Sequence, residues 1–89
     1  MVTARLTGNV WATRKAEALN GYKFLLASVI GGKGAGSQMV VVDTIGAGIG
    51  DRVIVATGSA ARQMLGDNTL PIDAAVVGII DEDCLFDED

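Results

Sequence analysis

The chain has 89 residues, 49% of them hydrophobic and 20% charged, which is the size and composition of one folded domain. Histidine is absent, so the sequence lacks the commonest general base and metal ligand of enzymes. A domain this small has a limited interior, and a mean hydropathy of +0.39 therefore predicts an oligomer in which other chains cover apolar surface.

The net charge of −4 is unevenly distributed along the chain. Six of the eleven acidic residues lie in the last nine positions, whereas residues 1–80 carry seven basic and five acidic side chains. This distribution predicts a nearly neutral domain over residues 1–81 and a short acidic tail over residues 82–89.

Residues 2–13 alternate between apolar and polar side chains, which predicts a half-buried β-strand. An asparagine-glycine turn then leads into a second predicted strand, residues 22–30. Residues 31–38 contain four glycines and predict a hairpin connection. The third predicted strand, residues 39–45, is rich in β-branched side chains.

The second half of the chain contains the one predicted helix. A fourth strand is expected over residues 52–57, followed by a helix over residues 60–65 that Ser59 caps and Gly66 terminates. Residues 72–80 form a nearly continuous apolar run, which predicts a fifth strand buried on both faces. This order of elements predicts an all-β fold, a small five-stranded OB-like β-barrel with one short helix.

The sequence predicts neither a membrane-spanning helix nor a secretory signal. The longest apolar run in the second half is far shorter than the roughly 20 residues that span a bilayer. The first residues lack the basic and apolar regions of a secretory signal, and the single cysteine, Cys84, cannot form an internal disulfide. We therefore expect a cytoplasmic protein with no membrane partner.

Two segments could suggest catalysis or cofactor binding. Residues 46–50 read G-A-G-I-G, which differs from the dinucleotide-binding G-x-G-x-x-G and precedes a predicted strand instead of a helix. A tight loop between strands explains these glycines better. Ser59 has neither a histidine nor a nearby lysine to activate it, and the aspartates lack the spacing of a calcium loop. We expect no catalytic residue, no cofactor and no metal ion.

Arg62 is predicted to lie in the first turn of the helix, where the helix dipole disfavours a cation by about 0.3–1 kcal/mol. A carboxylate should then compensate the charge, and Asp43 or Asp73, of the same chain or of a neighbouring copy, is the candidate partner. The alternative is an arginine that points into water.

Small OB-like barrels can bind single-stranded nucleic acid when aromatic side chains lie over a basic groove. The chain has one tryptophan, one tyrosine and two phenylalanines, and its domain is nearly neutral, so we expect no nucleic-acid partner. The acidic tail is predicted to be solvated. The alternative is that Leu85 and Phe86 add an edge strand or dock on a partner.

Several segments together resemble one known family. Residues 43–62, D-T-I-G-A-G-I-G-D-R-V-I-V-A-T-G-S-A-A-R, are similar to a signature of the bacterial microcompartment vertex proteins, the EutN/CcmL family. Residues 71–81, P-I-D-A-A-V-V-G-I-I-D, are similar to the second signature of that family. Residues 8–15 and 23–26 are similar to its first two strands, so the resemblance extends over almost the whole chain.

This resemblance implies an OB-like barrel, a cyclic homopentamer and no catalysis. The pentamer would form the vertex of a polyhedral shell that is otherwise built from hexameric or pseudohexameric tiles, supplying curvature and closing the shell around enzymes. The positions that match the family motifs are expected at the subunit interface or in the central region of the ring: Asp43, Gly46, Gly48, Gly50, Gly58, Ser59, Arg62, Pro71 and Asp73.

The chain departs from the family in one respect. Many relatives continue after the second signature with a further strand, whereas residues 81–89 of this chain are short and acidic. The alternative function is a small OB-like binding module for nucleic acid or a peptide, and a more distant one is an enzyme that uses Ser59.

Overall fold

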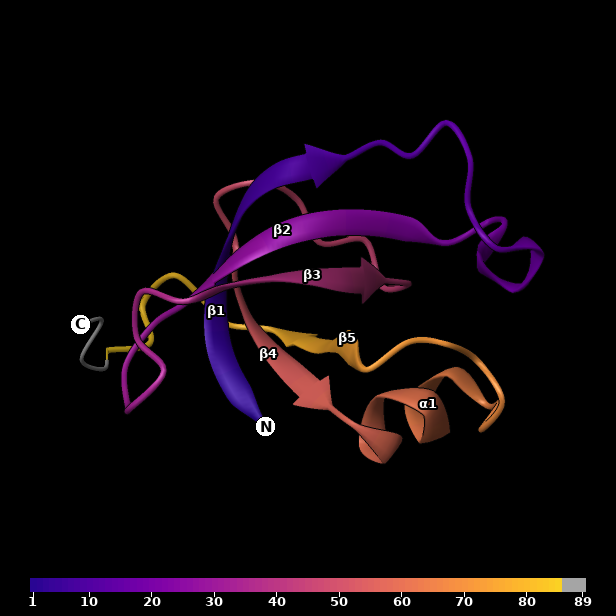
Figure 1. Ribbon diagram of the computed structural model, residues 1–89. Helices are drawn as coiled ribbons and strands as arrows, with labels where there is room; N and C mark the ends of the chain where they lie inside the picture. The colour runs from indigo at the N-terminus through magenta and orange to yellow at the C-terminus, as the bar shows by residue number, and fades with distance from the viewer. Residues whose placement is uncertain (86–89) are drawn as a thin grey trace.

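A computed structural model describes residues 1–85 and contains five strands that close into a barrel (Figure 1). One short helix lies outside the barrel, as Figure 1 shows. The all-β barrel predicted from the sequence is confirmed. The elements in chain order are β1 (Val2–Val10), a 3-10 turn η1 (Glu17–Leu19), β2 (Lys23–Val29), β3 (Gln38–Asp43), β4 (Arg52–Thr57), α1 (Ser59–Leu65) and β5 (Ala74–Ile79).

The order of the strands around the barrel is β1-β2-β3-β5-β4, and β4 pairs back with β1. All of these pairs are antiparallel except β3 and β5, which run parallel and share one register pair, Val42 with Ala75. Parallel strands require a crossover connection, and here residues 44–73, which include β4 and α1, provide it. With one register pair, the seam between β3 and β5 is the shortest pairing in the barrel.

The barrel interior is filled by one apolar core. On β1, Ala4 and Leu6 are buried while Thr7 and Asn9 are exposed, which follows the predicted alternation. The buried members of the core are Ala4, Leu6, Leu25, Ala27, Val41, Ala47, Val53, Val55, Ala74 and Val76. Most of them are alanine or valine, so the barrel interior is narrow and filled by small side chains.

A second apolar cluster lies on the outside of the barrel. Val42 of β3 packs there with Leu70 and Ile72 from the segment that joins α1 to β5. β5 begins at Ala74 and not at residue 72 as predicted, and Ile72 packs in this outer cluster before the strand begins. The cluster is completed by Leu19, Tyr22, Phe24 and Leu65.

Two other strand ends differ from the prediction by two residues or more. β1 ends at Val10 instead of residue 13, and the next side chain, Trp11, is 88% exposed. β3 ends at Asp43 instead of residue 45, because the Asp43 side chain binds the backbone of the residues that follow. Within the described residues, no helix is both long and apolar enough to cross a membrane.

The first residues of the predicted acidic tail are held against the barrel. Arg52 of β4 donates hydrogen bonds from its guanidinium to the carbonyl oxygens of Asp81 (2.8 Å), Glu82 (3.2 Å) and Cys84 (2.8 Å). The prediction of an edge strand or docking segment at Leu85 and Phe86 extends to residues outside the described part of the chain, and it stays a prediction.

Candidate functional site

The turn after β3 is built on the buried side chain of Asp43, which is 5% exposed. Its carboxylate accepts hydrogen bonds from the backbone N–H groups of Ile45 (3.3 Å), Gly46 (3.1 Å) and Ala47 (3.0 Å). Hydrogen bonds to an ionised acceptor are stronger than those between neutral groups, and these three replace the water that a buried carboxylate loses. Asp43 therefore sets the shape of the loop that follows β3.

The far end of the same loop is held by Asp51 and by β1. The Asp51 carboxylate accepts a hydrogen bond from the Gly48 N–H at 2.9 Å. Gly50 donates its N–H to the carbonyl oxygen of Leu6 at 2.8 Å, and its own carbonyl oxygen accepts from the guanidinium of Arg5 at 2.9 Å. The segment from residue 44 to residue 51, called the glycine loop below, is thus fixed at both ends.

The three glycines of this loop have different structural roles. Gly46 and Gly50 adopt φ values of +91° and +93°, which L side chains rarely adopt, whereas Gly48 lies outside that region. The interpretation as a tight loop between two strands is confirmed. The loop leaves Ile45 and Ile49 exposed, so its rigid backbone presents apolar side chains to the surroundings.

Helix α1 lies on the outer face of β4 and β5 and is close to them because the side chains between them are short. Ala61 is the buried residue of the helix. Ala56 of β4 and Ala75 of β5, which pair with each other, are also buried, but they do not belong to the core inside the barrel. Of the two alanines in the G-S-A-A-R motif, Ala61 thus packs the helix against the barrel, whereas Ala60 is exposed.

The predicted helix cap at Ser59 is wrong. Gly58 is the N-cap residue, with φ 64° and ψ −140°, and no side chain makes a capping hydrogen bond. Because the helix starts one residue earlier than predicted, Ser59 is its first helical residue and is exposed. The predicted end is confirmed, since Gly66 adopts the left-handed conformation with φ 81°.

The placement of Arg62 in the first turn of the helix is also wrong. In a helix of seven residues that starts at Ser59, Arg62 belongs to the last turn, where the dipole favours a cation. Its guanidinium donates a hydrogen bond to the carbonyl oxygen of Ile72 at 3.2 Å. Within the described chain, neither Asp43 nor Asp73 pairs with it, so the predicted carboxylate partner is not found in the same protomer.

The nine motif positions fall into two groups in the structure. Gly46, Gly48 and Gly50 lie in the glycine loop, and Asp43 is the last residue of β3 directly before it. Gly58, Ser59, Arg62, Pro71 and Asp73 lie at the start of α1 and on the segment that leads into β5. The second group is tied together by the bond of Arg62 to Ile72 and by the Gly58 N–H, which donates to the Asp73 carbonyl oxygen at 2.8 Å. No hydrogen bond between the two groups is present within residues 1–85.

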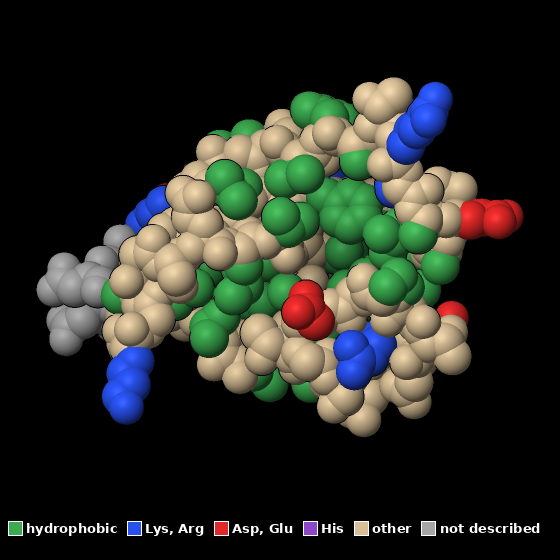
Figure 2. Space-filling view, viewed as in Figure 1, with side chains coloured by type: hydrophobic (Ala, Val, Ile, Leu, Met, Phe, Trp, Pro, Cys, Tyr) green, Lys and Arg blue, Asp and Glu red, His purple; other side chains and the backbone are tan. Residues whose placement is uncertain are grey.

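Apolar side chains remain exposed on the outside of the barrel. Figure 2 shows hydrophobic side chains gathered over β2 and β3. A groove of about 180 Å³ lies there at the seam between β3 and β5, next to Val40, which is 48% exposed. We call it the β3–β5 groove, and its lining residues are Phe24, Val40, Val42, Pro71, Ile72, Asp73 and Ala74.

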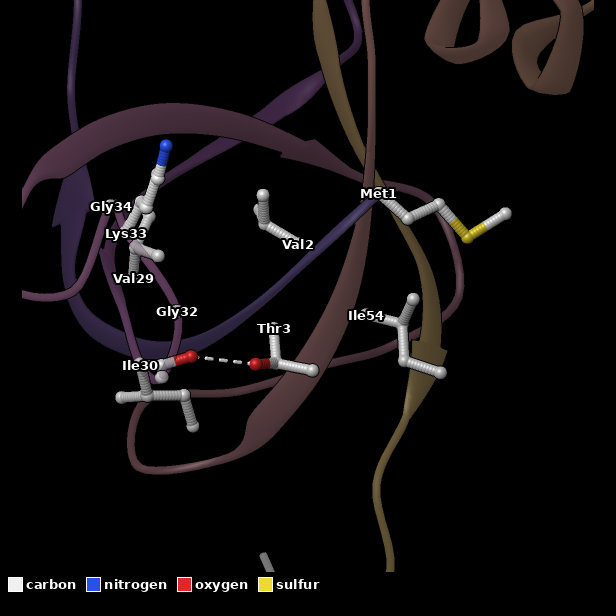
Figure 3. Close-up of a pocket in the computed structure, with 10 residues that line it drawn as sticks. Met1, Val2, Thr3, Val29, Ile30, Gly32, Lys33, Gly34 and Ile54 are labelled. Atoms are coloured by element: carbon white, nitrogen blue, oxygen red, sulfur yellow. Dashed lines mark hydrogen bonds between the residues drawn. The ribbon is translucent and has the colours of Figure 1, made fainter. Parts of the chain in front are cut away.

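A wider hollow of about 670 Å³ lies on another side of the barrel, over β1 and β4 (Figure 3). Met1 and Ile54 stand on one side of it and the loop with Lys33 on the other. The Thr3 hydroxyl at its floor donates to the carbonyl oxygen of Ile30 at 2.7 Å. We call this surface, with Met1 and Ile54, the β1–β4 face.

The structure also assembles a group that sequence reasoning missed. A hollow of about 240 Å³ at the end of β1 is lined by Trp11, Tyr22 and Phe24 together with Lys15 and Lys23. The turn at η1 brings the two parts of the chain together, so their separation in sequence hid the cluster. The Lys23 ammonium is already held by the carbonyl oxygen of Ala47 at 2.9 Å.

Asp67, just after α1, has a perturbed acidity. Its carboxylate accepts hydrogen bonds from the Thr69 hydroxyl at 2.6 Å and from the Thr69 N–H at 2.9 Å. These bonds hold the pKa of Asp67 below its ordinary value, the hydroxyl having the larger effect. His, Cys, Asp and Glu side chains form no group able to hold a metal ion within the described residues.

The chain is similar to known proteins in sequence and in fold. Residues 1–81 match the family model EutN_CcmL, described as "Ethanolamine utilisation protein EutN/carboxysome". The chain is 48% identical over 83 residues to the bacterial microcompartment shell vertex protein GrpN of Rhodospirillum rubrum, covering 91% of this chain and 93% of that protein. It is 45% identical to the carboxysome shell vertex protein CcmL of Thermosynechococcus vestitus, covering 91% of this chain and 84% of that protein.

The barrel is also similar to solved structures. The GrpN pentameric microcompartment shell protein from Rhodospirillum rubrum superposes with a TM-score of 0.78 at 47% sequence identity. That superposition covers 91% of this chain and 95% of the other. Similarity in sequence and in fold therefore extends over nearly the full length of both proteins.

Proposed function

The chain belongs to the EutN/CcmL family, and on this premise we propose that it forms the pentameric vertex of a bacterial microcompartment shell. The role is structural and involves no catalysis. A flat sheet of hexamers cannot close, whereas a five-membered ring at each corner introduces the curvature that closure requires. The protein therefore caps the shell and helps to enclose the enzymes inside it.

The observation that carries this proposal is the amount of apolar surface that one barrel leaves exposed. The large hydrophobic side chains that are exposed within the described residues are Met1, Trp11, Val40, Ile45, Ile49, Ile54, Met64, Ile79 and Leu85. The total accessible surface of one protomer is 5431 Å². A standard interface buries about 800 Å² on each partner, so contacts with a neighbour on each side would cover about 1,600 Å² of it. Ring assembly thus gives the exposed aliphatic residues a place away from water, and it accounts for the mean hydropathy of +0.39.

The motif positions have structural tasks that fit such a ring. The glycine loop holds Ile45 and Ile49 on a rigid backbone, and we assign Asp43, Gly46, Gly48 and Gly50 to that support. We assign Gly58, Ser59, Arg62, Pro71 and Asp73 to the contact between protomers, because they form one exposed or half-buried surface around α1.

The partners follow from the same role. The chain would contact other copies of itself within the ring and hexameric or pseudohexameric shell tiles around it, in the cytoplasm. Nucleic acid and membranes are not expected as partners, since residues 1–80 carry only seven basic side chains against five acidic ones.

Two measurements test the vertex role. Native mass spectrometry at micromolar concentration should give a pentamer. Co-expression with hexameric shell tiles should then give closed particles by electron microscopy, whereas the tiles alone should give open or leaky ones. A chain that stays monomeric, or tiles that close equally well without it, would refute the proposal.

The alternative, an OB-like module that binds nucleic acid, rests on one specific feature. The hollow lined by Trp11, Tyr22, Phe24, Lys15 and Lys23 combines stacking surfaces with positive charge. Trp11 is the one tryptophan of the chain, so its emission reports directly on this hollow. Titration with single-stranded oligonucleotides at physiological salt should leave the emission unchanged, and saturable quenching would favour the alternative.

A further inference from the structure

Each protomer exposes apolar residues in two hollows on separate sides of its barrel, and we propose that these are the two halves of one contact between neighbours. The β1–β4 face of one protomer would pack against the β3–β5 groove of the next, with Met1 and Ile54 seated in the groove. This inference rests on the proposed function, because it specifies how the ring of that function is joined.

Symmetry requires two different surfaces for such a contact. In a cyclic ring of more than two identical copies, neighbours meet head to tail, so each protomer presents one patch forward and another patch backward. The strand order β1-β2-β3-β5-β4 puts the β3–β5 seam and the β4–β1 pair on different sides of the closed barrel. The groove and the face therefore meet the requirement of a head-to-tail contact.

The two surfaces differ in what they offer a neighbour, since one is a narrow groove and the other has apolar side chains at its edge. The groove of about 180 Å³ is smaller than the roughly 300–1,000 Å³ of small-molecule sites, which makes it the size for side chains. Met1 and Ile54 stand side by side at the edge of the β1–β4 face (Figure 3), and Ile54 is 36% exposed. Inserting them beside Val40 would bury aliphatic groups of both protomers at once.

The wider hollow of the β1–β4 face does not have the polar groups of a ligand site. The Thr3 hydroxyl, which lies at its floor, is already bonded to Ile30 within the protomer. Its other side chains are aliphatic apart from Lys33, and glycines form much of its rim. A hollow of this composition fits the side chains of a neighbouring copy better than a polar ligand.

Charge fixes the direction of the pairing. Lys33 is exposed at the rim of the β1–β4 face, and Asp73 is exposed beside the groove. Within residues 1–85, neither side chain makes a hydrogen bond or ion pair of its own. When Ile54 enters the groove, Lys33 would face Asp73 of the partner subunit. An exposed pair of this kind orients the contact more than it strengthens it.

A complementation experiment tests the pairing. Val40→Asp places a charge in the groove, and Ile54→Asp places one on the β1–β4 face. Both side chains are partly exposed on the outside of the barrel, so each variant should fold, as circular dichroism would verify. Each variant alone should be monomeric by native mass spectrometry. Their mixture should form a 1:1 heterodimer and no ring, because one intact face then meets one intact groove.

The outcomes separate this inference from the function on which it rests. A wild-type chain that is monomeric refutes the function itself. A pentameric wild type whose two variants also stay pentameric, or whose folded variants fail to form the heterodimer, refutes only the pairing. The matched control is Leu85→Asp, which adds a charge at an exposed apolar residue outside both surfaces. It should remain pentameric, and loss of its ring would overturn the assignment.

Charge reversal provides a second test that does not depend on apolar packing. Lys33→Asp or Asp73→Lys alone should raise the protomer concentration at which the pentamer dissociates, by about threefold to tenfold. The double variant should restore most of the wild-type value. Reversals that have no effect, or effects that simply add in the double variant, would show that these residues do not face each other.

Discussion

The glycine loop gives the sharpest test of the structure because its three glycines differ in backbone conformation. Gly46 and Gly50 have φ values of +91° and +93°, whereas Gly48 lies outside the left-handed region. A Cβ added at Gly48 would have Asp51 Oδ2 as its nearest neighbour at 4.0 Å, an ordinary contact. Alanine at each position therefore adds the same methyl group to three backbones with different tolerance for it.

The expected magnitudes follow from these conformations. A left-handed conformation costs an L-residue such as alanine about 1–2 kcal/mol, so Gly46→Ala and Gly50→Ala should each lower the free energy of unfolding by that amount. For a domain of this size, about 1 kcal/mol corresponds to about 4–8 °C in Tm. Gly48→Ala should instead leave the stability unchanged or raise it by about 0.4–1 kcal/mol, because alanine restricts the unfolded chain.

Thermal unfolding followed by circular dichroism measures these changes, at several protein concentrations because ring assembly also contributes to Tm. If Gly48→Ala destabilises the fold as strongly as the other two, the left-handed conformations do not govern this loop and the reasoning is wrong. If Gly48→Ala folds normally but fails to form pentamers, Gly48 packs against a neighbouring protomer, as its motif position predicts.

Three further predictions concern side chains of the two motif groups and the loop after α1. Asp43→Ala leaves three backbone amides without their acceptor and should cost about 3 kcal/mol of unfolding free energy, with Asp43→Asn losing less, as denaturant titration would measure. Arg62→Ala removes the bond to Ile72 and should loosen the pentamer, seen as a higher protomer concentration at which the pentamer dissociates, whereas unchanged assembly and Tm would refute it. Because Thr69 lowers the folded-state pKa of Asp67, the ionised carboxylate stabilises the fold above its unfolded-state pKa, and this contribution is lost as pH falls through the folded-state value. In Thr69→Val the Asp67 pKa measured by NMR should return toward its ordinary value.

Much of the fold could be predicted because local patterns determine it. The alternation along β1 and the glycine-rich hairpin before β3 require no knowledge of distant residues. The parallel pairing of β3 with β5 could not be predicted in this way, since it depends on how 30 intervening residues, 44–73, travel around the barrel. Ile72 illustrates the limit, because an apolar run alone does not distinguish a strand residue from one that covers the outside of a strand.

The candidate site was predicted less completely than the fold, because its properties depend on the exact start of one helix and on hydrogen bonds within one loop. A difference of one residue in the start of α1 moved Arg62 from a turn where the dipole disfavours it to one where the dipole favours it. Asp43 was one of two candidate partners for Arg62, with Asp73 as the other, but three backbone amides that follow it bind its carboxylate. Hydrogen bonds to a residue's own neighbours leave no pattern in composition or charge, so only the structure reveals them.

The core explains why this chain depends on assembly. Alanine and valine dominate the barrel interior, whereas the larger aliphatic residues Ile45, Ile49 and Ile54 remain exposed on the outside. A narrow core of small side chains buries little apolar area per residue, so one barrel gains limited stability by itself. Contacts with two neighbours bury apolar side chains that a single protomer leaves exposed. Folding stability and ring formation are then linked, and the stability of the vertex rises with the concentration of the protomer.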